Sequence, residues 1–261
     1  MARLRAAVLA AGRGLRMGGR GVKTLFPVGE HRPLLFYILN GLEQAGVDDV
    51  LVVTGFRPRD VEAFVAEHAG RLGTSFVRNA RYATWGNFHY VRMALEGSPD
   101  DDVLVVNSDV VVHPDVYRRV ARSEGDLVPA LEQRPDLDAE DMRVQIEGGR
   151  LMGIGKDLDM AVSHGEYDGV SLIRPPAARL YTEHCTRLEW AGCTSVYYEE
   201  VYQRLLGDVD GRAVAVAPGE YAEVDTPDDV PGAAEVISRH AWAWEAKERG
   251  PEVPAVPKQD G

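Results

Sequence analysis

The sequence is poor in cysteine and has no long apolar run. Cys185 and Cys193 are its only cysteines among 261 residues, too few for a disulfide framework and without a histidine at metal-ligand spacing. We therefore expect buried free thiols in a cytoplasmic protein. No apolar stretch approaches the ~20 residues that cross a bilayer, so we expect no membrane partner. The short apolar run near the start leads into glycines rather than a cleavage site, which argues against a secretory signal.

The sequence also lacks an excess of basic residues. Lysine and arginine number 29 against 41 aspartates and glutamates, a net charge of −12. Because nucleic-acid-binding proteins usually carry a basic excess, we expect no nucleic-acid partner. The length and ordinary composition fit one domain, which we place at residues 1–245, with an acceptor-binding or lid part at about 126–200. Residues 246–261 are rich in proline, glycine and charge, and we expect them to be disordered.

Two familiar phosphate-binding motifs are missing from the first thirty residues. The Walker pattern is absent, and the dinucleotide pattern fails because Met17 stands where its third glycine should be. Instead, a predicted strand at 4–9 runs into Ala-Ala-Gly-Arg-Gly-Leu-Arg-Met at 10–17, and Lys23 follows six residues later. Such a glycine-broken basic loop lets backbone N–H groups approach a polyphosphate. The alternative is a flexible turn with incidental arginines.

Predicted strands and helices alternate along the first half of the chain. This alternation predicts an α/β fold with a doubly wound, mostly parallel, Rossmann-like sheet, helices on both faces, and ligands at the carboxyl ends of the strands. The predicted strands lie at 4–9, 50–54, 75–77 and 102–107, and the helices at 33–46, 58–68 and 87–95.

The second half shows shorter strands. We interpret strands at 126–131, 142–147, 150–154 and 169–173 as a small added β region that forms the acceptor or lid part. Gly148-Gly149 suits a hairpin turn between two of them. A helix at 197–206, a strand at 214–217 and a final helix at 226–240 follow. Thr226 would cap that last helix, with Asp229 at its third position.

One carboxylate, that of Asp109, occupies a position suited to a phosphate-bound Mg²⁺ ion. Asp109 follows the predicted strand 102–107, and Asp225 precedes the final helix. Glu223 shares a strand face with Asp225 by alternation. Alternatively, Asp109 is a turn residue that caps a helix beginning at Pro114, and Asp225 merely favours a helix dipole. Thr226 already suits the capping role.

These motifs together resemble one enzyme family. Leu-Ala-Ala-Gly-x-Gly-x-Arg-Met, then Lys23-Thr-Leu-Phe-Pro-Val, resembles the signature loop of the nucleotidyltransferases that make NDP-sugars, CDP-alcohols and related metabolites. Glu-Val-Asp-Thr-Pro-x-Asp at 223–229 resembles the family's late motif. Asn-x-x-Tyr-x-x-x-x-Asn at 79–87 narrows the likeness to the CTP:phosphocholine and phosphonate cytidylyltransferases.

The resemblance implies a Mg²⁺-dependent reaction. A nucleoside monophosphate would pass from an NTP, CTP being favoured, to a small phosphorylated or phosphonylated acceptor, with release of pyrophosphate. A polyol, cyclitol, aminoalcohol, sugar or aminophosphonate would serve as the acceptor. Choline is disfavoured, because the aromatic residue expected near Asp141 to hold a quaternary ammonium is missing. The alternatives are a sugar-1-phosphate uridylyl-, thymidylyl- or guanylyltransferase and a non-catalytic nucleotide-sensing module, and a homodimer is left open.

Each candidate residue has an expected role. Lys23 would contact the α-phosphate and the attacking oxygen, and Arg16 the outer phosphates. Asn87 would read the base or simply cap a helix, and Gly86 would let a pyrimidine lie close to backbone. Asp109 and Asp225 would hold Mg²⁺. The nucleotide-binding residues would be Leu9, Ala10, Ala11, Gly12, Gly14, Asn79, Gly86 and Asn87, and the acceptor-binding residues Lys156 (phosphate), Glu166 or Asp168 (hydroxyl or amine), Tyr198 and Glu223.

Overall fold

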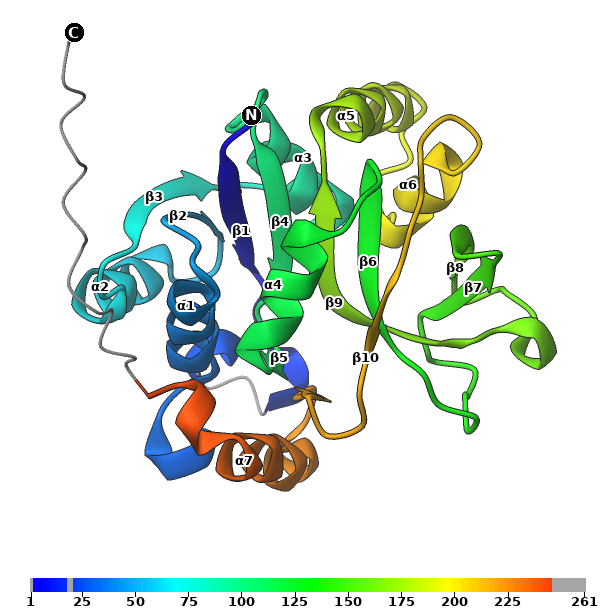
Figure 1. Ribbon diagram of the computed structural model, residues 1–261. Coiled ribbons are helices and arrows are strands. Elements are labelled where there is room, and N and C mark those ends of the chain that lie inside the picture. The colour runs from blue at the N-terminus through cyan, green and yellow to red at the C-terminus, as the bar shows by residue number, and fades with distance from the viewer. Residues whose placement is uncertain (1, 18–20, 246–261) are drawn as a thin grey trace, which may run out of the picture.

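A computed structural model describes residues 2–17 and 21–245 of the chain. Its centre is a nine-stranded sheet, in which seven strands follow the order β10-β6-β9-β4-β1-β2-β3 (Figure 1). The tail at 246–261, for which we predict disorder, lies outside the described residues. The strands are β1 (Leu4–Ala10), β2 (Asp49–Thr54), β3 (Gly73–Arg78), β4 (Asp102–Asn107), β6 (Leu127–Glu132), β7 (Arg143–Glu147), β8 (Arg150–Gly155), β9 (Gly165–Ile173) and β10 (Val214–Val216).

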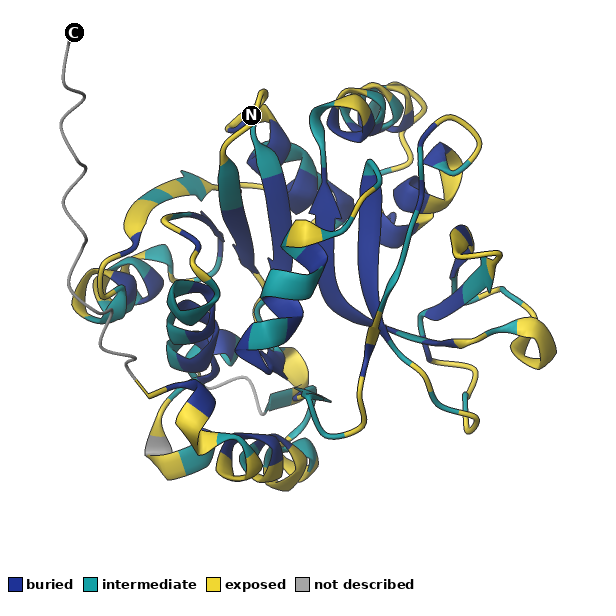
Figure 2. Ribbon diagram, in the orientation of Figure 1, coloured by how far each residue is buried: buried dark blue, intermediate teal, exposed yellow. Residues whose placement is uncertain are grey.

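The first half of the sheet is parallel. β1 pairs in parallel with β2 on one side and β4 on the other, and β3 extends the sheet beyond β2. The apolar runs of β1, β2 and β4 are buried on both faces, as Figure 2 shows in dark blue, whereas β3 at the edge is more exposed. Continuous apolar strands need helices on both sides, because neither face can be left to water.

Helices cover both faces of the sheet. One apolar core joins it to α1 (Leu34–Ala45), α2 (Pro58–His68) and α4 (Pro114–Arg122). A second core on the other face joins it to α3 (Phe88–Glu96), α5 (Pro175–Trp190) and α6 (Tyr198–Leu205) (Figure 1). The predicted α/β class, with its mostly parallel Rossmann-like sheet, is therefore confirmed.

The second half departs from the expected lid. β6 and β9 are buried strands of the central sheet, and β9 runs antiparallel to both neighbours, β4 and β6. The hairpin of β7 and β8 joins the sheet at the start of β9, where Arg143 and Val144 pair with Glu166 and Gly165, and the rest of it projects outward (Figure 1). Gly148 and Gly149 turn this hairpin with φ of 54° and 79°, as predicted. Part of the segment that we assigned to a lid thus belongs to the core.

A small second sheet carries part of the site. β5 (Val110–Val112) pairs antiparallel with β11 (Tyr221–Glu223), and α7 (Val230–Arg239) packs beside them. The predicted capping pair is present, because Asp229 accepts hydrogen bonds from the Thr226 N–H at 2.7 Å and the Asp225 N–H at 3.0 Å. A 3-10 turn over Pro227–Asp229 precedes α7, so the helix begins at Val230 rather than Thr226.

Two expectations concern the cysteines and membrane-spanning helices. Cys185 is buried but Cys193 is exposed, so the prediction of two buried thiols is wrong for Cys193, which follows the end of α5. Among the described residues, no helix combines the length and apolarity needed to cross a bilayer.

Candidate active site

The site lies at the carboxyl edge of the parallel strands. A pocket of about 570 Å³ opens there, beside a smaller one of about 140 Å³. Lys23, Asn87, Asn107 and Asp109 line both pockets, so the two spaces adjoin. The register pairs Leu9 of β1 with Asn107 of β4, which brings the N-terminal loop and the segment after β4 together.

Three carboxylates meet on one side of the larger pocket. One oxygen from each of Asp109, Glu223 and Asp225 lies within 4.8 Å of the others. Asp109 precedes β5, and the pairing of β5 with β11 brings Glu223 opposite Val110. The backbone oxygen of Asp109 also accepts the Val224 N–H at 2.8 Å. Residues more than a hundred positions apart are thus fixed at the same point.

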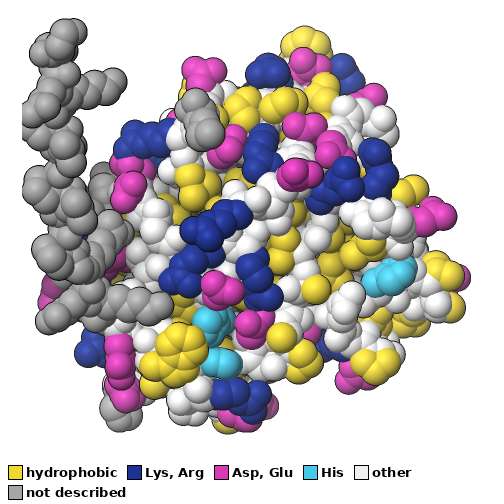
Figure 3. Space-filling view, in the orientation of Figure 1, with side chains coloured by type: hydrophobic (Ala, Val, Ile, Leu, Met, Phe, Trp, Pro, Cys, Tyr) yellow, Lys and Arg dark blue, Asp and Glu magenta, His cyan; other side chains and the backbone are white. Residues whose placement is uncertain are grey.

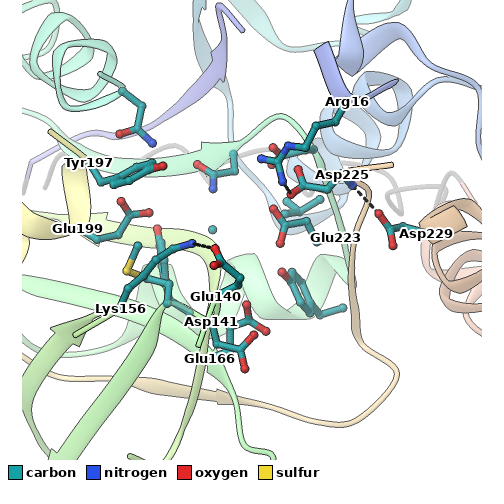
Figure 4. A pocket seen from close by; sticks show the side chains of 18 of the residues that line it. Arg16, Glu140, Asp141, Lys156, Glu166, Tyr197, Glu199, Glu223, Asp225 and Asp229 are labelled. Carbon is teal, nitrogen blue, oxygen red and sulfur yellow. Dashed lines mark hydrogen bonds and ion pairs between the residues drawn. The ribbon is translucent and has the colours of Figure 1, made fainter. Parts of the chain in front are cut away.

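Lys23 ties two of these carboxylates together. Its Nζ donates to Asp109 Oδ2 at 2.8 Å and to Asp225 Oδ1 at 2.5 Å, and its side chain is only 14% exposed. Burial alone would lower the pKa of Lys23, but the two aspartates outweigh it and hold that pKa above its usual value, so the ammonium stays charged. Arg16 pairs with the other oxygen of Asp225 (Figure 4). A Cβ on Gly14 would lie 2.4 Å from Lys23 Cβ, so the glycine allows the loop to pass this lysine.

The donor set fits a hard divalent cation. Mg²⁺ prefers carboxylate oxygens at ~2.1 Å, so two of its ligands lie up to ~4.2 Å apart, and small rotations would bring these three carboxylates that close. Asp109 Oδ1 is buried and has no hydrogen-bond partner in the described chain. Desolvation, then Asp109 and Asp225, raises the pKa of Glu223 to about 8. Three clustered carboxylates with an orphaned oxygen are what a bound cation would satisfy.

Residues other than Asp109 and Asp225 cap the two neighbouring helical segments. His113, not Asp109, caps α4, because its Nδ1 accepts the Asp115 N–H at 3.1 Å. Thr226 and Asp229 cap the turn before α7. The Asp225 carboxylate is left to Lys23 and Arg16.

The smaller pocket contains half of the predicted nucleotide-binding residues. Leu9, Ala10, Gly12 and Asn87 line it, while Ala11, Gly14, Asn79 and Gly86 do not. Asn87 stands at the start of α3 but makes no capping bond there, so the capping alternative is wrong. Its Oδ1 instead accepts the backbone N–H of Tyr198 at 2.9 Å. Asn79 is fully buried, and its Oδ1 accepts the Arg81 N–H at 2.8 Å. It therefore stabilises the loop without lining the pocket.

Gly86 has a different role from the one we expected. Its N–H donates to Thr194 O at 2.7 Å, and a Cβ there would lie 2.1 Å from Val196 O. The backbone of 194–196 therefore occupies the space that we assigned to a pyrimidine. Gly86 joins the loop before α3 to the loop before α6.

Gly86→Ala should destabilise the fold. The new methyl would overlap backbone, which cannot move like a side-chain tip, so we expect urea denaturation to show a loss of about 3 kcal/mol in the free energy of unfolding. Gly207→Ala is the matched control, because nothing lies within 4 Å of its added Cβ, and its change should stay within about 0.5 kcal/mol. Equal stability of the two variants would contradict the close approach.

The predicted acceptor residues divide into two groups. Lys156, Glu166 and Glu223 line the larger pocket. Lys156 pairs with Glu140 at 3.1 Å (Figure 4). Glu166 pairs with Arg134 at 3.1 Å.

Asp168 and Tyr198 do not line the pocket, which corrects their predicted contact with an acceptor. Asp168 lies on a strand enclosed by β6 and accepts the Glu132 N–H at 2.8 Å, and it is fully buried. Burial also raises the pKa of Asp168 well above its usual value. Tyr198 is fully buried behind Asn107, whose Oδ1 accepts its hydroxyl at 3.0 Å.

Glu199 is a site residue that the sequence reasoning missed. It lines the pocket, is only 5% exposed, and its Oε2 has no partner among residues 2–17 and 21–245. Desolvation raises its pKa to about 7. In sequence it is a glutamate in the first turn of a helix, a common surface position, so only docking of α6 reveals its burial. The other lining residues that we had not assigned to the site are Asn107, Val110, Asp138, Glu140, Asp141, Met142, Tyr167, Gly169, Tyr197, Tyr221 and Asp229.

The pocket is strongly acidic. Figure 4 shows Glu199 and Tyr197 across the space from Glu223 and Asp225, with Glu140, Asp141 and Glu166 between the two sides. The face over α1 and α4 instead mixes charges of both signs (Figure 3). The lining carboxylates are Asp109, Asp138, Glu140, Asp141, Glu166, Glu199, Glu223, Asp225 and Asp229, and the lining cations are Arg16, Lys23 and Lys156.

Comparison with known proteins identifies the family. Residues 6–143, more than half of the chain, match the model of a MobA-like NTP transferase domain. A bifunctional IPC transferase and DIPP synthase of Rubrobacter xylanophilus is 30% identical over 241 residues, 89% of this chain and 51% of the relative. A CMP-5'-(3-aminopropyl)phosphonate synthase of Streptomyces rubellomurinus is 34% identical over 149 residues, 56% of this chain and 23% of the relative. The chain thus spans about half the length of the first relative and about a quarter of the second.

Solved structures share the fold at low identity. The inositol-1-phosphate CTP transferase from T. maritima superposes with a TM-score of 0.74 at 19% identity, over 91% of this chain and 97% of that one. The CTP:phosphocholine cytidylyltransferase of Streptococcus pneumoniae gives 0.73 at 18% identity, over 90% and 99%. With its glycine-broken basic loop, paired carboxylates and doubly wound sheet, the chain belongs to the family of MobA-like NTP transferase domains and is of the nucleotidyltransferase type.

Proposed function

We propose that this protein transfers CMP from CTP to a small acceptor with a phosphate or phosphonate at one end and a primary amine at the other. The observation that carries the proposal is the group of Lys23, Asp109, Glu223 and Asp225, fixed where the two pockets adjoin. Nucleotidyl transfer brings two anions together, so it needs charge neutralisation and positioning more than covalent chemistry.

In the proposed reaction, an acceptor oxygen attacks the α-phosphorus of CTP. A new P–O bond forms, the bond to the β-phosphate bridging oxygen breaks, and pyrophosphate leaves with that electron pair. The Lys23 ammonium neutralises charge on the α-phosphate and orients the incoming oxygen, and Arg16 holds the leaving phosphates. Asp109 and Asp225, with Glu223 beside them, would hold Mg²⁺, which as a Lewis acid draws charge from the phosphate oxygens. No general base is needed, because the acceptor oxygen is already ionised.

The preference for CTP rests on the smaller pocket and on Asn87. A space of about 140 Å³ suits a single-ring base. Because Asn87 Oδ1 is occupied by the Tyr198 N–H, its amide can offer only N–H donors to a base. Cytosine presents an acceptor at N3, whereas uracil presents a donor there. The 34% identical relative whose name includes CMP agrees with this preference.

The amine rests on Glu199. One oxygen of this buried carboxyl group, Oε2, has no partner among the described residues, which is unfavourable until a ligand satisfies it. A primary ammonium supplies both the opposite charge and the N–H donors. A quaternary ammonium has no N–H, and the exposed Tyr197 leaves it without an enclosing aromatic cage. A sugar 1-phosphate likewise offers no ammonium to Glu199.

The proposal is tested with a panel of nucleotides and acceptors. CTP, UTP, dTTP, GTP and ATP are each combined with a 2-aminoethyl phosphonate, its 2-hydroxyethyl analogue, phosphocholine, inositol 1-phosphate and glucose 1-phosphate, and pyrophosphate release is measured. We expect the highest kcat/KM with CTP and the amine. A preference for a purine nucleotide or for a sugar phosphate would overturn the assignment, and nucleotide binding without turnover would favour the sensing alternative.

Glu199→Gln should lower activity with the amine acceptor alone. Loss of the charged hydrogen bond should reduce kcat/KM for the aminoethyl acceptor by about 10- to 100-fold, with little change for the hydroxyethyl analogue. Glu200→Gln is the matched control, since Glu200 is the exposed neighbour on the same helix turn. An equal loss with both acceptors would mean that Glu199 does not bind the amine.

A further inference from the structure

The wall between the two pockets carries two neutral amides, and a single residue holds both. Asn87 Oδ1 accepts the backbone N–H of Tyr198 at 2.9 Å, and Asn107 Oδ1 accepts the Tyr198 hydroxyl at 3.0 Å. Both asparagines line both pockets, whereas Tyr198 is fully buried behind them. Tyr198 therefore touches both substrate-facing amides without facing the substrates itself.

We infer that Tyr198 is a positioning residue that holds Asn87 and Asn107 with their NH₂ groups toward the substrates. The inference rests on the proposed function, because the ligands it concerns are the nucleotide and the acceptor anion. Two NH₂ groups offer N–H donors and no acceptor. Such a wall suits phosphate oxygens and ring acceptors, and it adds no positive charge that the neighbouring carboxylates would capture.

The orientation of Asn87 follows from one contact. A backbone N–H can only donate, so the amide oxygen of Asn87 must face Tyr198. Its Nδ2 is then the atom left for the pocket, which Asn87 lines.

The orientation of Asn107 follows from a buried chain of hydroxyls. The Tyr198 hydroxyl lies 3.1 Å from the Tyr167 hydroxyl. The Tyr167 hydroxyl lies 3.1 Å from Ser171 Oγ, and Ser171 Oγ lies 2.9 Å from the Tyr202 hydroxyl. Each hydroxyl has one hydrogen. If each hydroxyl donates its hydrogen to the next group in the direction from Tyr202 to Asn107, every hydrogen has an acceptor, and the last acceptor is Asn107 Oδ1. The reverse order leaves the Tyr202 hydrogen buried without an acceptor in the described chain, at a cost of about 1–3 kcal/mol.

Two further observations agree with this order. Burial raises the pKa of Tyr167, Tyr198 and Tyr202 well above the usual value, so each phenol keeps the hydrogen that the order requires. A Cβ on Gly169 would lie 2.7 Å from Asn107 Nδ2. The missing side chain at Gly169 thus leaves room for the NH₂ group.

A double-mutant cycle tests whether Tyr198 acts through Asn107. Tyr198→Phe removes the hydroxyl but keeps the ring and the backbone N–H to Asn87. We expect kcat/KM for CTP to fall about tenfold, because Asn107 can then turn its oxygen toward an anionic substrate. In an Asn107→Ala background the same change should alter kcat/KM less than about twofold.

Tyr202→Phe is the matched control. It removes an equally buried hydroxyl at the other end of this series of hydroxyls. The remaining hydroxyls can still donate their hydrogens in the direction of Asn107. We expect a comparable drop in Tm for Tyr198→Phe and Tyr202→Phe, but unchanged kinetic constants for Tyr202→Phe. Equal kinetics of the two variants, or a tenfold loss that persists without Asn107, would overturn the inference.

A measurement on the wild-type protein tests the inference even if Tyr198→Phe does not fold. The side-chain NH₂ signals of Asn87 and Asn107 in ¹⁵N–¹H spectra should both shift when Mg²⁺ and CTP are added, and unmoved signals would overturn the inference. This arm needs only binding. Absence of turnover with every nucleotide would therefore refute the proposed transfer and leave the positioning role to be judged by the spectra.

Discussion

Lys23→Met should reduce kcat by about a thousandfold, because a charge fixed where negative charge develops in a transition state is typically worth 10²–10³ in rate. The side chain is held between Asp109 and Asp225 where the two pockets adjoin. Because the contact should strengthen during the reaction, we expect the loss in kcat rather than in KM for CTP. Steady-state kinetics with CTP and the amine acceptor provide the measurement.

Two variants control for the loss of charge. Arg179→Met removes one positive charge from an exposed position on α5 and should leave kcat unchanged. Lys23→Arg keeps the charge but replaces a compact ammonium with a planar group, so it should restore only a small part of the activity. Near-normal turnover of Lys23→Met would remove Lys23 from the reaction.

Asp225→Asn should lower kcat/KM by about 10²- to 10³-fold and raise the Mg²⁺ concentration needed for half-maximal rate. The substitution removes one of three clustered carboxylates and leaves Lys23 and Arg16 with weaker partners. In the wild type, Mg²⁺ should raise Tm, because an ion that binds the folded state stabilises it. In the variant this rise should largely disappear.

Asp228→Asn makes the same chemical change three residues along the chain. Asp228 is exposed and does not line the pocket, so its Mg²⁺ dependence should match that of the wild type. A wild-type Mg²⁺ response in Asp225→Asn would show that the ion is held elsewhere.

Local signals were sufficient for much of the fold. Apolar runs placed β1, β2 and β4, and the helix predicted at 58–68 is α2 without change. The Thr226–Asp229 cap depends on residues three apart, so it could be found from the sequence. The motif positions of Lys23, Asp109 and Asp225 come together because the first two follow the ends of parallel strands, which share one edge of the sheet.

Short strands that form only by pairing with residues far away in the sequence could not be predicted in the same way. β5 and β11 have three residues each and exist because they pair with one another. The helix α5 begins with Pro175-Pro176, which reads as a break in a sequence although proline suits a first helical turn.

Burial of single side chains was the hardest property to predict. Asp168 and Tyr198 stand beside true pocket residues in sequence, yet the packing of β9 and α6 encloses them. The same packing brings Glu199 to the pocket wall. Polar residue type indicates a site, but which neighbour faces it depends on how the elements dock.

The central claim is that a Mg²⁺-dependent cytidylyl transfer takes place between Lys23 and the three carboxylates. The most direct measurement is a ³¹P NMR time course of the protein with CTP, an aminoalkyl phosphonate and Mg²⁺. We predict that pyrophosphate and a new phosphonate–phosphate anhydride signal grow in equal amounts, and that neither forms with Lys23→Met or without Mg²⁺. Pyrophosphate without the anhydride, or turnover that persists in Lys23→Met, would contradict the account.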